Sequence, residues 1–120
     1  MHEYNKAIGS IGELYAIEYM KNLDYKLMDR NFRSRFGEID IIARDGIYIV
    51  FIEVKTRYNS VYGLPCESVN YNKMSKLKKT AEYYILKNKL HKNYFRFDVI
   101  EIYLDYNDNL YSAKLIKNAF

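Results

Sequence analysis

One apolar segment near the middle of the chain limits its fold more than any other feature. Residues 47–54, IYIVFIEV, are rich in β-branched and aromatic side chains and carry a single charge, that of Glu53. A run of this length and composition is typical of a buried strand. The preceding segment EIDIIAR, residues 38–44, has the pattern of a second strand, and the Asp45-Gly46 pair between them favours a tight hairpin. The chain is therefore expected to form a buried β-sheet.

Two longer segments have the periodicity of amphipathic helices. They span residues 4–23 and 70–90, on either side of the hairpin. The residues expected on their apolar stripes are Ile8, Tyr15, Tyr19 and Leu23 in the first segment and Met74, Leu77, Ala81 and Ile85 in the second.

Shorter strands are predicted around these helices. The remaining segments are strands at 25–32, 95–104 and 110–116, a loop at 58–68 and a turn at 107–109. The order of elements predicts an α/β fold with a central mixed β-sheet flanked by helices. Since no linker or repeat interrupts the pattern, residues 1–120 are expected to form a single domain.

Composition and charge narrow the class of protein. Of the 120 residues, 49% are hydrophobic, which is enough for a core, and the net charge of +4 is a mild preference for anionic partners. The single cysteine, Cys66, cannot form an internal disulfide, which fits a reducing compartment. No apolar run approaches the length of a membrane span, and the first residues have no apolar signal core. We therefore expect a cytoplasmic protein without a membrane partner.

Charged residues in the hairpin form the candidate site. A loop centred on Asp45-Gly46 would place Asp40 opposite Phe51. Asp40 then shares a face with Glu53, one diagonal step away, at about 7–8 Å between Cα atoms. Lys55 alternates onto the same face of the second strand.

Two acids and a lysine in this arrangement suit the hydrolysis of a phosphodiester bond. Mg²⁺ takes oxygen ligands, so Asp40, Glu53 and a substrate phosphate could complete its coordination shell. Lys55 could orient the attacking water or stabilise the charge that builds on the phosphorane. The alternative interpretation is a surface ion pair between Glu53 and Lys55 at the end of a strand.

Two more acids are candidates for the same site. Glu13 could reach it from the first helix as a third acid, or could lie at the edge of the apolar stripe and extend to water. Gly9 and Gly12 could permit a close approach of this helix to the sheet or to a phosphate backbone. Glu38 would lie opposite Glu53, where it either joins the site around a cation or turns to solvent. The apolar residues that share the stripe of Glu13 are Ala16, Ile17 and Met20.

Basic side chains surround these acids in the sequence. They are Arg30, Arg33, Arg35, Arg57, Lys73, Lys76, Lys78 and Lys79. A basic rim beside an acidic metal site suits a polyanionic substrate, because phosphate contacts supply affinity without reading sequence. The alternative is an ordinary solvated helix face.

Other chemistries fit this sequence poorly. His2 and His91 lie far apart and form no zinc pattern, and Cys66 lacks a histidine partner for a thiol enzyme. The chain contains neither the glycine-rich loop of nucleoside-triphosphate-binding proteins nor a dinucleotide-binding fingerprint.

Four sequence blocks occur together and in order. They are GSIGELYA (9–16), NFRSRFGEIDIIA (31–43), VFIEVKTR (50–57) and RFDVI (96–100), followed by the closing NAF. With these blocks the chain resembles, over nearly its whole length, the YraN family of small bacterial proteins. That family is similar to the PD-(D/E)XK nucleases, which have the restriction-endonuclease-like fold, and in its core to archaeal Holliday junction resolvases.

This resemblance implies roles for the same residues. Asp40 and Glu53 would be metal ligands, Lys55 the catalytic lysine, and Glu13 the helix-borne acid of the resolvase-like branch. Ile39 stands where proline precedes the aspartate in the name-giving motif, and that proline serves backbone geometry. The candidates for contacts with substrate phosphates are Arg33, Arg57, Lys73 and Lys76.

The expected function is that of a nuclease that depends on Mg²⁺ or Mn²⁺ and hydrolyses DNA, with branched or otherwise structured DNA as a substrate. A resolvase cuts two strands, so that activity would require a symmetric homodimer. Two alternatives remain open at this point: a nucleic-acid-binding module of the same fold that does not cleave, and a structural or interaction domain whose ion pairs stabilise the sheet.

Overall fold

Two helices and five strands make up the part of the chain described by the structure, a computed structural model in which residues 2–58, 71–104 and 111–120 are placed. In chain order they are α1 (His2–Asn22), β1 (Lys26–Ser34), β2 (Gly37–Asp45), β3 (Tyr48–Tyr58), α2 (Tyr71–Lys87), β4 (Tyr94–Leu104) and β5 (Tyr111–Ile116). The predicted order is confirmed, and the last predicted strand does close the sheet. The predicted loop at 58–68, beyond Tyr58, and the predicted turn at 107–109 lie outside the described residues.

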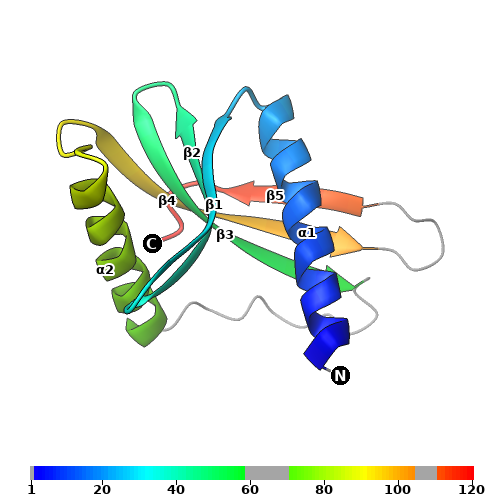
Figure 1. Cartoon of the computed structure of the whole chain (residues 1–120). Coiled ribbons are helices and arrows are strands. Elements are labelled where there is room, and N and C mark those ends of the chain that lie inside the picture. Colours follow the sequence, from blue (N-terminus) through cyan, green and yellow to red (C-terminus); the bar gives the residue numbers. More distant parts are fainter. Residues whose placement is uncertain (1, 59–70, 105–110) are drawn as a thin grey trace.

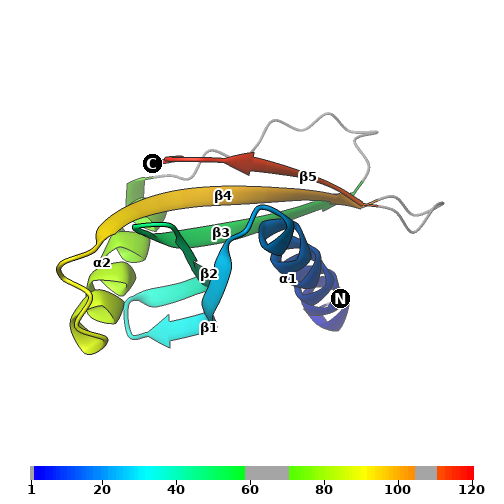
Figure 2. The same ribbon diagram turned by 90° about the horizontal axis from the view of Figure 1, so that it is seen from above.

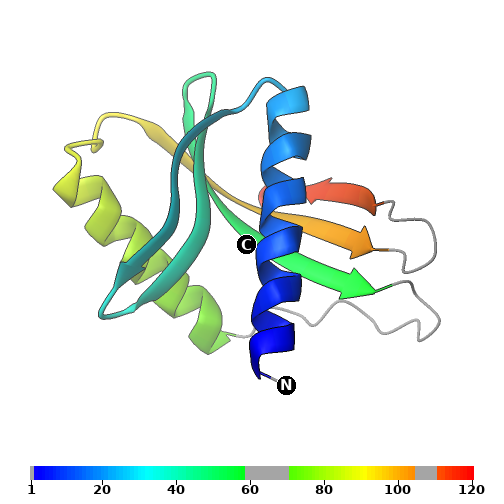
Figure 3. The same ribbon diagram turned by 45° about the vertical axis from the view of Figure 1, so that its right-hand side comes forward.

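The strands form one mixed sheet in the order β1-β2-β3-β4-β5. Neighbouring strands run antiparallel except β3 and β4, which are parallel and have α2 between them in the chain. The β1–β2 hairpin passes between the two helices (Figures 1 and 3), and it is turned away from the layer of β3, β4 and β5 (Figure 2). This is the predicted α/β arrangement and is consistent with a restriction-endonuclease-like fold. Neither described helix has an apolar stretch long enough to cross a membrane.

One face of the sheet packs against α1. Strand residues at alternate positions point to this face, where they meet a single stripe of the helix. The buried members include Ala16, Ile17 and Met20 of α1 and Ile41, Val50, Ile52, Ile100 and Ile102 of the sheet. The predicted stripe of α1 is therefore displaced: Tyr15 and Tyr19 border the core and Leu23 is exposed, while the side chain of Ile8 lies outside the described residues. Small Ala16 and flexible Met20 fit the narrow space beneath the helix, whereas tyrosines suit its edge, where the hydroxyl meets water.

The opposite face packs against α2. Its buried residues are Ile39, Ile42, Ile49 and Phe51 of the sheet and Leu77, Ala81 and Tyr84 of the helix. Phe51 stacks on Phe97 of β4 with 5.4 Å between ring centroids. Leu77 and Ala81 confirm the predicted stripe of α2, and Met74 and Ile85 border it.

The hairpin between β2 and β3 turns one position later than predicted. Asp45 pairs with Tyr48, so the turn residues are Gly46 and Ile47. Gly46 has φ 58°, a conformation that glycine adopts without strain, and it therefore takes the first turn position. As a result Phe51 pairs with Ile42, and the predicted pairing of Asp40 with Phe51 is wrong by two residues. A shift of two residues preserves the face on which each side chain lies, so the predicted common face of the site acids does not depend on this error.

A buried ion cluster ties β4 to the hairpin. Arg96 is 6% exposed and Asp98 is 0% exposed, and the Arg96 guanidinium contacts Asp98 through Nε at 2.9 Å and Asp45 through Nη1 at 3.0 Å. Arg96 also donates to the Tyr25 hydroxyl at 2.6 Å, and burial raises the pKa of Tyr25 to about 12. Asn118 N–H donates to Asp98 at 3.1 Å. Each buried charge in this cluster therefore has partners, as a buried charge requires.

Gly12 lets α1 approach β3 closely. A Cβ atom at Gly12 would lie 1.8 Å from Thr56 Oγ1 and 2.9 Å from Thr56 Cβ. The predicted close approach of the helix to the sheet is confirmed at Gly12, whereas the side-chain surroundings of Gly9 lie outside the described residues.

Substitution Gly12→Ala is expected to destabilise the protein although alanine is the better helix former. The gain in helix propensity is about 1 kcal/mol, but the clash with Thr56 forces the helix outward and costs about 1–3 kcal/mol or more. We expect a lower urea midpoint for Gly12→Ala and little change for Ile11→Ala, which alters an exposed position of the same helix. Equal midpoints for the two variants would contradict the close approach.

Removal of the Arg96 charge is expected to be strongly destabilising. Arg96→Met keeps the apolar stem but leaves Asp98 buried without its cation, a change that typically costs about 3–5 kcal/mol. Chemical unfolding should show this loss, whereas Lys114→Met on the exposed face of β5 should lie within about 0.5 kcal/mol of wild type. A loss below about 1 kcal/mol for Arg96→Met would mean that the cluster does not hold β4 to the hairpin.

Candidate active site

The β1–β2 hairpin separates from β3 beside the candidate acids. Strand β2 starts at Gly37, but its pairing with β3 begins only at Ile41 and Ile52. At Asp40, the residue of β2 before Ile41, a side chain supplies the hydrogen-bond acceptor that a main-chain carbonyl would otherwise supply. Val54 N–H donates to Asp40 Oδ2 at 2.8 Å. The sheet opens at this point, and Asp40 is held at the opening.

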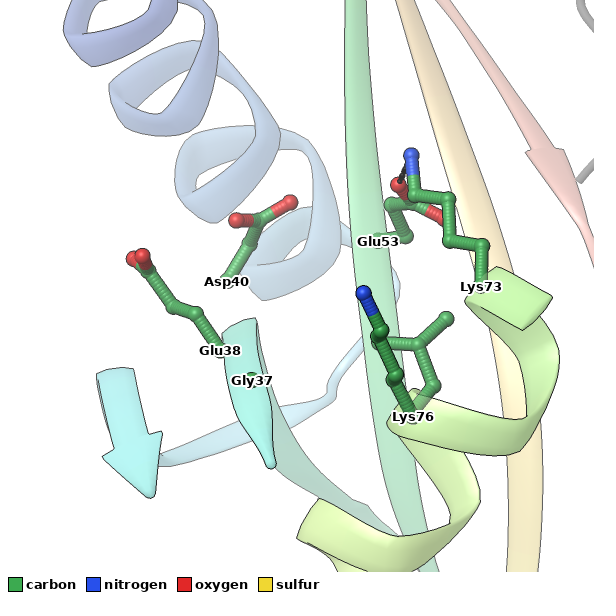
Figure 4. Close-up of a pocket in the computed structure, with 7 residues that line it drawn as sticks. Gly37, Glu38, Asp40, Glu53, Lys73 and Lys76 are labelled. Atoms are coloured by element: carbon green, nitrogen blue, oxygen red, sulfur yellow. Dashed lines mark ion pairs between the residues drawn. The ribbon is translucent and has the colours of Figure 1, made fainter. Parts of the chain in front are cut away.

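A hollow of about 170 Å³ lies at the opening. It is lined by Gly37, Glu38 and Asp40 of β2, Glu53 of β3, and Lys73, Lys76 and Leu77 of α2. Figure 4 shows the acidic side chains projecting from the strands and the two lysines reaching across from the first turns of α2. Of the predicted site residues, the structure thus brings together Asp40, Glu53, Lys73 and Lys76.

Glu53 is more enclosed than Glu38 in the hollow. Its side chain is 10% exposed, and Oε1 forms an ion pair with the ammonium of Lys73 (Figure 4). The other oxygen, Oε2, is buried and accepts no hydrogen bond from the residues that the structure describes. A buried carboxylate oxygen without a donor is costly, so Glu53 has capacity for a further positive group.

Asp40 holds its proton more tightly than a free aspartate. Its pKa is raised from 3.8 to about 7: burial is the main cause, the hydrogen bond from Val54 opposes the shift, and the negative charges of Glu13, Glu53 and Glu38 add to it. The charged form of Asp40 is therefore disfavoured at this position.

Glu13 lies on the other side of the hairpin, against β1. Its carboxylate is 3.9 Å from Arg30 Nη2, and Asn31, with its amide nitrogen turned toward the acids, bridges Glu13 at 3.1 Å and Glu38 at 3.2 Å. Burial raises the pKa of Glu13, and the contacts with Asn31 and Arg30 lower it. Glu13 acts on Asp40 through its charge, which raises the pKa of Asp40. Sequence analysis did not predict the bridge through Asn31, a residue that has φ 53° within β1.

Two predicted residues follow Glu53 at alternate positions of β3. Lys55 and Arg57 point to the same face as Glu53, but neither is among the described residues that line the hollow. Arg57 Nε lies 3.6 Å from Glu101 Oε2, which also accepts a hydrogen bond from the Tyr103 hydroxyl at 2.7 Å. Glu101 is 1% exposed and is the register partner of Lys55 on β4.

Sequence analysis missed Glu101, a buried acid behind the site. Its position in the strand FRFDVIEIYL places it on the same face as Phe97 and Val99, and an acid on that face was the available signal. Arg57, a predicted contact of substrate phosphates, forms an internal ion pair with Glu101, and its role toward phosphate stays a prediction.

Glu38 and Arg33 face each other across the β1–β2 hairpin. They are register partners, with Arg33 Nε 3.4 Å from Glu38 Oε2, and the Arg33 side chain is 78% exposed. The predicted position of Glu38 opposite Glu53 is therefore wrong, because the hairpin turns later than expected and Glu38 pairs with β1. Arg33 lies outside the lining of the 170 Å³ hollow, on the exposed side of the hairpin.

The start of α2 gives the hollow a positive side. Its first turn contains Lys73 and no acid, although the positive end of the helix dipole disfavours a lysine there by about 0.3–1 kcal/mol. Lys76 follows one turn later and also lines the hollow. This arrangement places positive potential opposite Asp40 and Glu53, where an anion that approaches the acids would meet it.

The donor set fits a hard divalent cation in part. Carboxylate oxygens are the ligands that Mg²⁺ and Mn²⁺ take, and the buried Glu53 Oε2 and the raised pKa of Asp40 both favour an added positive charge. Within the described residues, no three acidic, histidine or cysteine side chains converge as a complete ligand cluster. Asp40 and Glu53 would therefore have to be supplemented by water or substrate oxygens.

Comparison with known proteins identifies the family of this chain. The family model described as "Uncharacterised protein family UPF0102" matches residues 12–102. The chain belongs to this family, which is the YraN family, so the resemblance drawn from the sequence blocks is confirmed.

Several relatives match over the whole chain. It is 56% identical to the UPF0102 protein of Clostridium botulinum strain Hall and 57% identical to that of Clostridium botulinum strain 657, each over 121 residues that cover 100% of this chain and 98% of the relative. The UPF0102 protein of Clostridium kluyveri is 55% identical over 120 residues with the same coverage. These names give the family but no activity, so function has to be argued from the site.

The charge of Asp40 is expected to limit stability at neutral and higher pH. A carboxyl whose folded pKa of about 7 exceeds its ordinary value of 3.8 stabilises the fold below that ordinary value, and this contribution is lost as the pH rises through about 7. In chelator, Asp40→Asn should therefore exceed wild type in stability by on the order of 1–2 kcal/mol at pH 8 and by less at pH 5. Urea unfolding at the two pH values measures the difference.

The control for this comparison is Glu82→Gln, which removes an exposed acid of α2. It should follow wild type at both pH values. Added Mg²⁺ should stabilise wild type at pH 8 by mass action and should affect Asp40→Asn much less. A gain for Asp40→Asn that is the same at pH 5 and pH 8 would contradict the raised pKa.

Proposed function

We propose that this protein is a nuclease of the cytoplasm that hydrolyses phosphodiester bonds of DNA with Mg²⁺ or Mn²⁺, with branched or otherwise structured DNA as substrate. The observation that carries the proposal is the pairing of Asp40 and Glu53 in one hollow, where Glu53 Oε2 is buried without a donor and lysines of α2 form the opposite wall. Two acids beside a basic wall suit a substrate that is itself an anion and is cleaved with a cation.

Asp40 and Glu53 would hold the divalent cation. Both carry carboxylate oxygens into the hollow, and both are disfavoured as isolated anions there, Asp40 by burial and neighbouring acids and Glu53 by its unpaired oxygen. When bound, the cation supplies Lewis-acid polarisation of the scissile phosphate.

The chain's own cations would bind and orient the substrate. Lys73 and Lys76 present ammonium groups at the positive end of α2, where the phosphate next to the cleaved bond would be held. Lys55 lies two residues beyond Glu53 on the same face of β3 and would stabilise the negative charge that develops on the phosphate during attack. Glu13 would position the site through Asn31 and its charge.

Two observations favour a second function, that of a nucleic-acid-binding module that does not cleave. Lys73 already neutralises Glu53, and no complete ligand cluster is present among the described residues. The same hollow would then bind a phosphate through Lys73 and Lys76 without the aid of a cation. Cleavage distinguishes the two functions.

Cleavage of nucleic acid is expected to require the cation, both acids and the lysine. We would incubate the protein with labelled four-way junction, flap, linear duplex, single-stranded DNA and RNA in Mg²⁺, Mn²⁺ or chelator. Asp40→Asn, Glu53→Gln and Lys55→Ala should each lower the cleavage rate by about 100-fold or more, since each removes a group that acts on the reacting phosphate. The structured DNA substrates should be cut fastest, and a junction cut on two strands should require two copies of the chain.

Matched controls on α2 separate these effects from a general change of charge. Glu82→Gln removes an exposed acid and Lys78→Ala removes an exposed lysine, both outside the hollow. Each should leave the cleavage rate within about twofold of wild type. If no substrate is cut but the protein binds DNA in low salt, the second function replaces the first. If it neither cuts nor binds, both proposals fail and the ion pairs only stabilise the fold.

A further inference from the structure

A second hollow lies at the tip of the β1–β2 hairpin. Its volume is about 380 Å³, and it is lined by Arg33, Ser34, Arg35 and Phe36 of the hairpin and Tyr83 of α2. We call it the hairpin hollow. It combines two arginines with two aromatic rings, and this volume lies within the range of small-ligand sites.

The turn that forms this hollow is unusual for a two-residue hairpin. Ser34 pairs with Gly37, so Arg35 and Phe36 are the two turn residues. Such turns normally use Asn, Asp or Gly, as the β2–β3 hairpin does with Gly46. A turn that presents a cation and an aromatic ring in place of turn-forming residues breaks a local rule, and such violations tend to occur where function requires them.

Hydrogen bonds hold the tip in place against α2. Ser34 Oγ lies 3.3 Å from Thr80 Oγ1 and accepts from Phe36 N–H at 3.0 Å. Thr80, which is fully buried, donates to the Lys76 carbonyl at 2.8 Å. The position of the hairpin tip relative to α2 is therefore fixed, and a ligand would not have to order it.

Tyr83 forms an aromatic wall of the hairpin hollow. Its ring stacks on Phe32 with 6.0 Å between centroids, and the residue is 45% exposed. Nearby, the Arg35 guanidinium lies 4.9 Å from the centroid of the Phe36 ring. An exposed aromatic ring beside arginines is the combination with which proteins bind single-stranded nucleic acid, since bases stack on the ring and cations contact the phosphates.

We propose that the hairpin hollow binds an unpaired nucleotide, with its base stacked on Tyr83 and its phosphates contacted by Arg33 and Arg35. This inference rests on the proposed function only in taking the ligand of the protein to be nucleic acid. A fully paired strand keeps its bases stacked inside the duplex and cannot offer one to Tyr83. The hollow therefore selects nucleic acid that has unpaired nucleotides near the hollow of Asp40 and Glu53.

The spacing of the two hollows along α2 would let one nucleic-acid strand reach both. Lys76 lines the first hollow and Tyr83 the second, and the seven positions between them correspond to about 10 Å of helix rise. This distance equals about three steps of a stacked strand at about 3.4 Å each. Gly37 lines the first hollow beside Lys76, and Ser34, its register partner, lines the second. One strand could therefore place a phosphate at the first hollow and an unpaired base, a few nucleotides away, at Tyr83.

Binding in chelator tests this inference without any cleavage. A duplex with a short single-stranded tail that carries 2-aminopurine is compared with a fully paired duplex that carries the same base. Wild type should quench 2-aminopurine in the tail, because stacking quenches it, and should bind the tailed DNA more tightly than the paired DNA. Tyr83→Leu should remove the quenching and weaken binding of the tailed DNA by at least about fivefold, while its affinity for the paired duplex stays the same.

Three controls sharpen the result. Tyr83→Phe keeps an aromatic ring and should retain quenching, and Tyr94→Leu, which removes an exposed tyrosine of β4, should behave as wild type. Arg35→Gln should reduce the salt dependence of binding by about one phosphate contact. Circular dichroism of each variant shows whether it is folded.

The outcomes separate this inference from the proposed nuclease activity. Quenching that depends on Tyr83, without metal-dependent cleavage, supports the nucleotide site and excludes the nuclease. Cleavage together with equal binding of tailed and paired DNA by wild type and Tyr83→Leu overturns the nucleotide site and leaves the nuclease intact. Binding of an acidic peptide in preference to any tailed DNA would also overturn it.

Discussion

The hydrogen bond from Val54 N–H to the Asp40 carboxylate determines how this sheet is built. A main-chain amide in a strand requires an acceptor, and past Ile41 the acceptor for β3 comes from a side chain of β2. The hairpin can therefore leave the sheet without an unsatisfied amide, and α2 packs against its departing strands. The hollow between β2, β3 and α2 follows from this separation. Asp40 thus combines a structural contact through one carboxylate oxygen with a charge that the fold compensates poorly.

Buried charges on the two faces of the sheet differ in how completely they are paired. On the α1 face, Arg96 and its partner Asp98 form a cluster whose members have several polar contacts each, which is the pattern of a structural ion pair. On the α2 face, Glu53 retains an oxygen without a donor among the described residues, and the pKa of Asp40 is raised by burial and, to a smaller extent, by neighbouring acids. The ammonium of Lys73 lies on the carboxylate of Glu53. The first arrangement is the one that stability alone favours, whereas the second has an electrostatic cost that an added positive charge would offset.

Sequence patterns predicted the elements of this fold well because hydrophobic periodicity reports local burial. The hairpin illustrates both the success and the limit: its existence followed from Asp45-Gly46, but which residue took the first turn position depended on the backbone conformation of Gly46. The common face of Asp40 and Glu53 could be predicted because side chains alternate with period two, so an error of two residues leaves it unchanged. The position of Glu38 opposite β1 and the ion pair of Arg57 with buried Glu101 could not be predicted, since both depend on which strands become neighbours.

Departures from local rules in this chain gather around the β1–β2 hairpin and the start of α2. A lysine occupies the first turn of a helix whose dipole disfavours it, an arginine and a phenylalanine form a two-residue turn, and an aspartate that burial favours as neutral faces other acids. Each departure has a stability cost, whereas the surrounding core and the Arg96 cluster follow the rules closely. The departures are also chemically related. The basic and aromatic groups beside the acids are suited to an extended anion that carries flat rings. A polynucleotide has both properties. Its phosphates would be compensated by the positive potential of α2, and a cation would compensate the charges of Asp40 and Glu53.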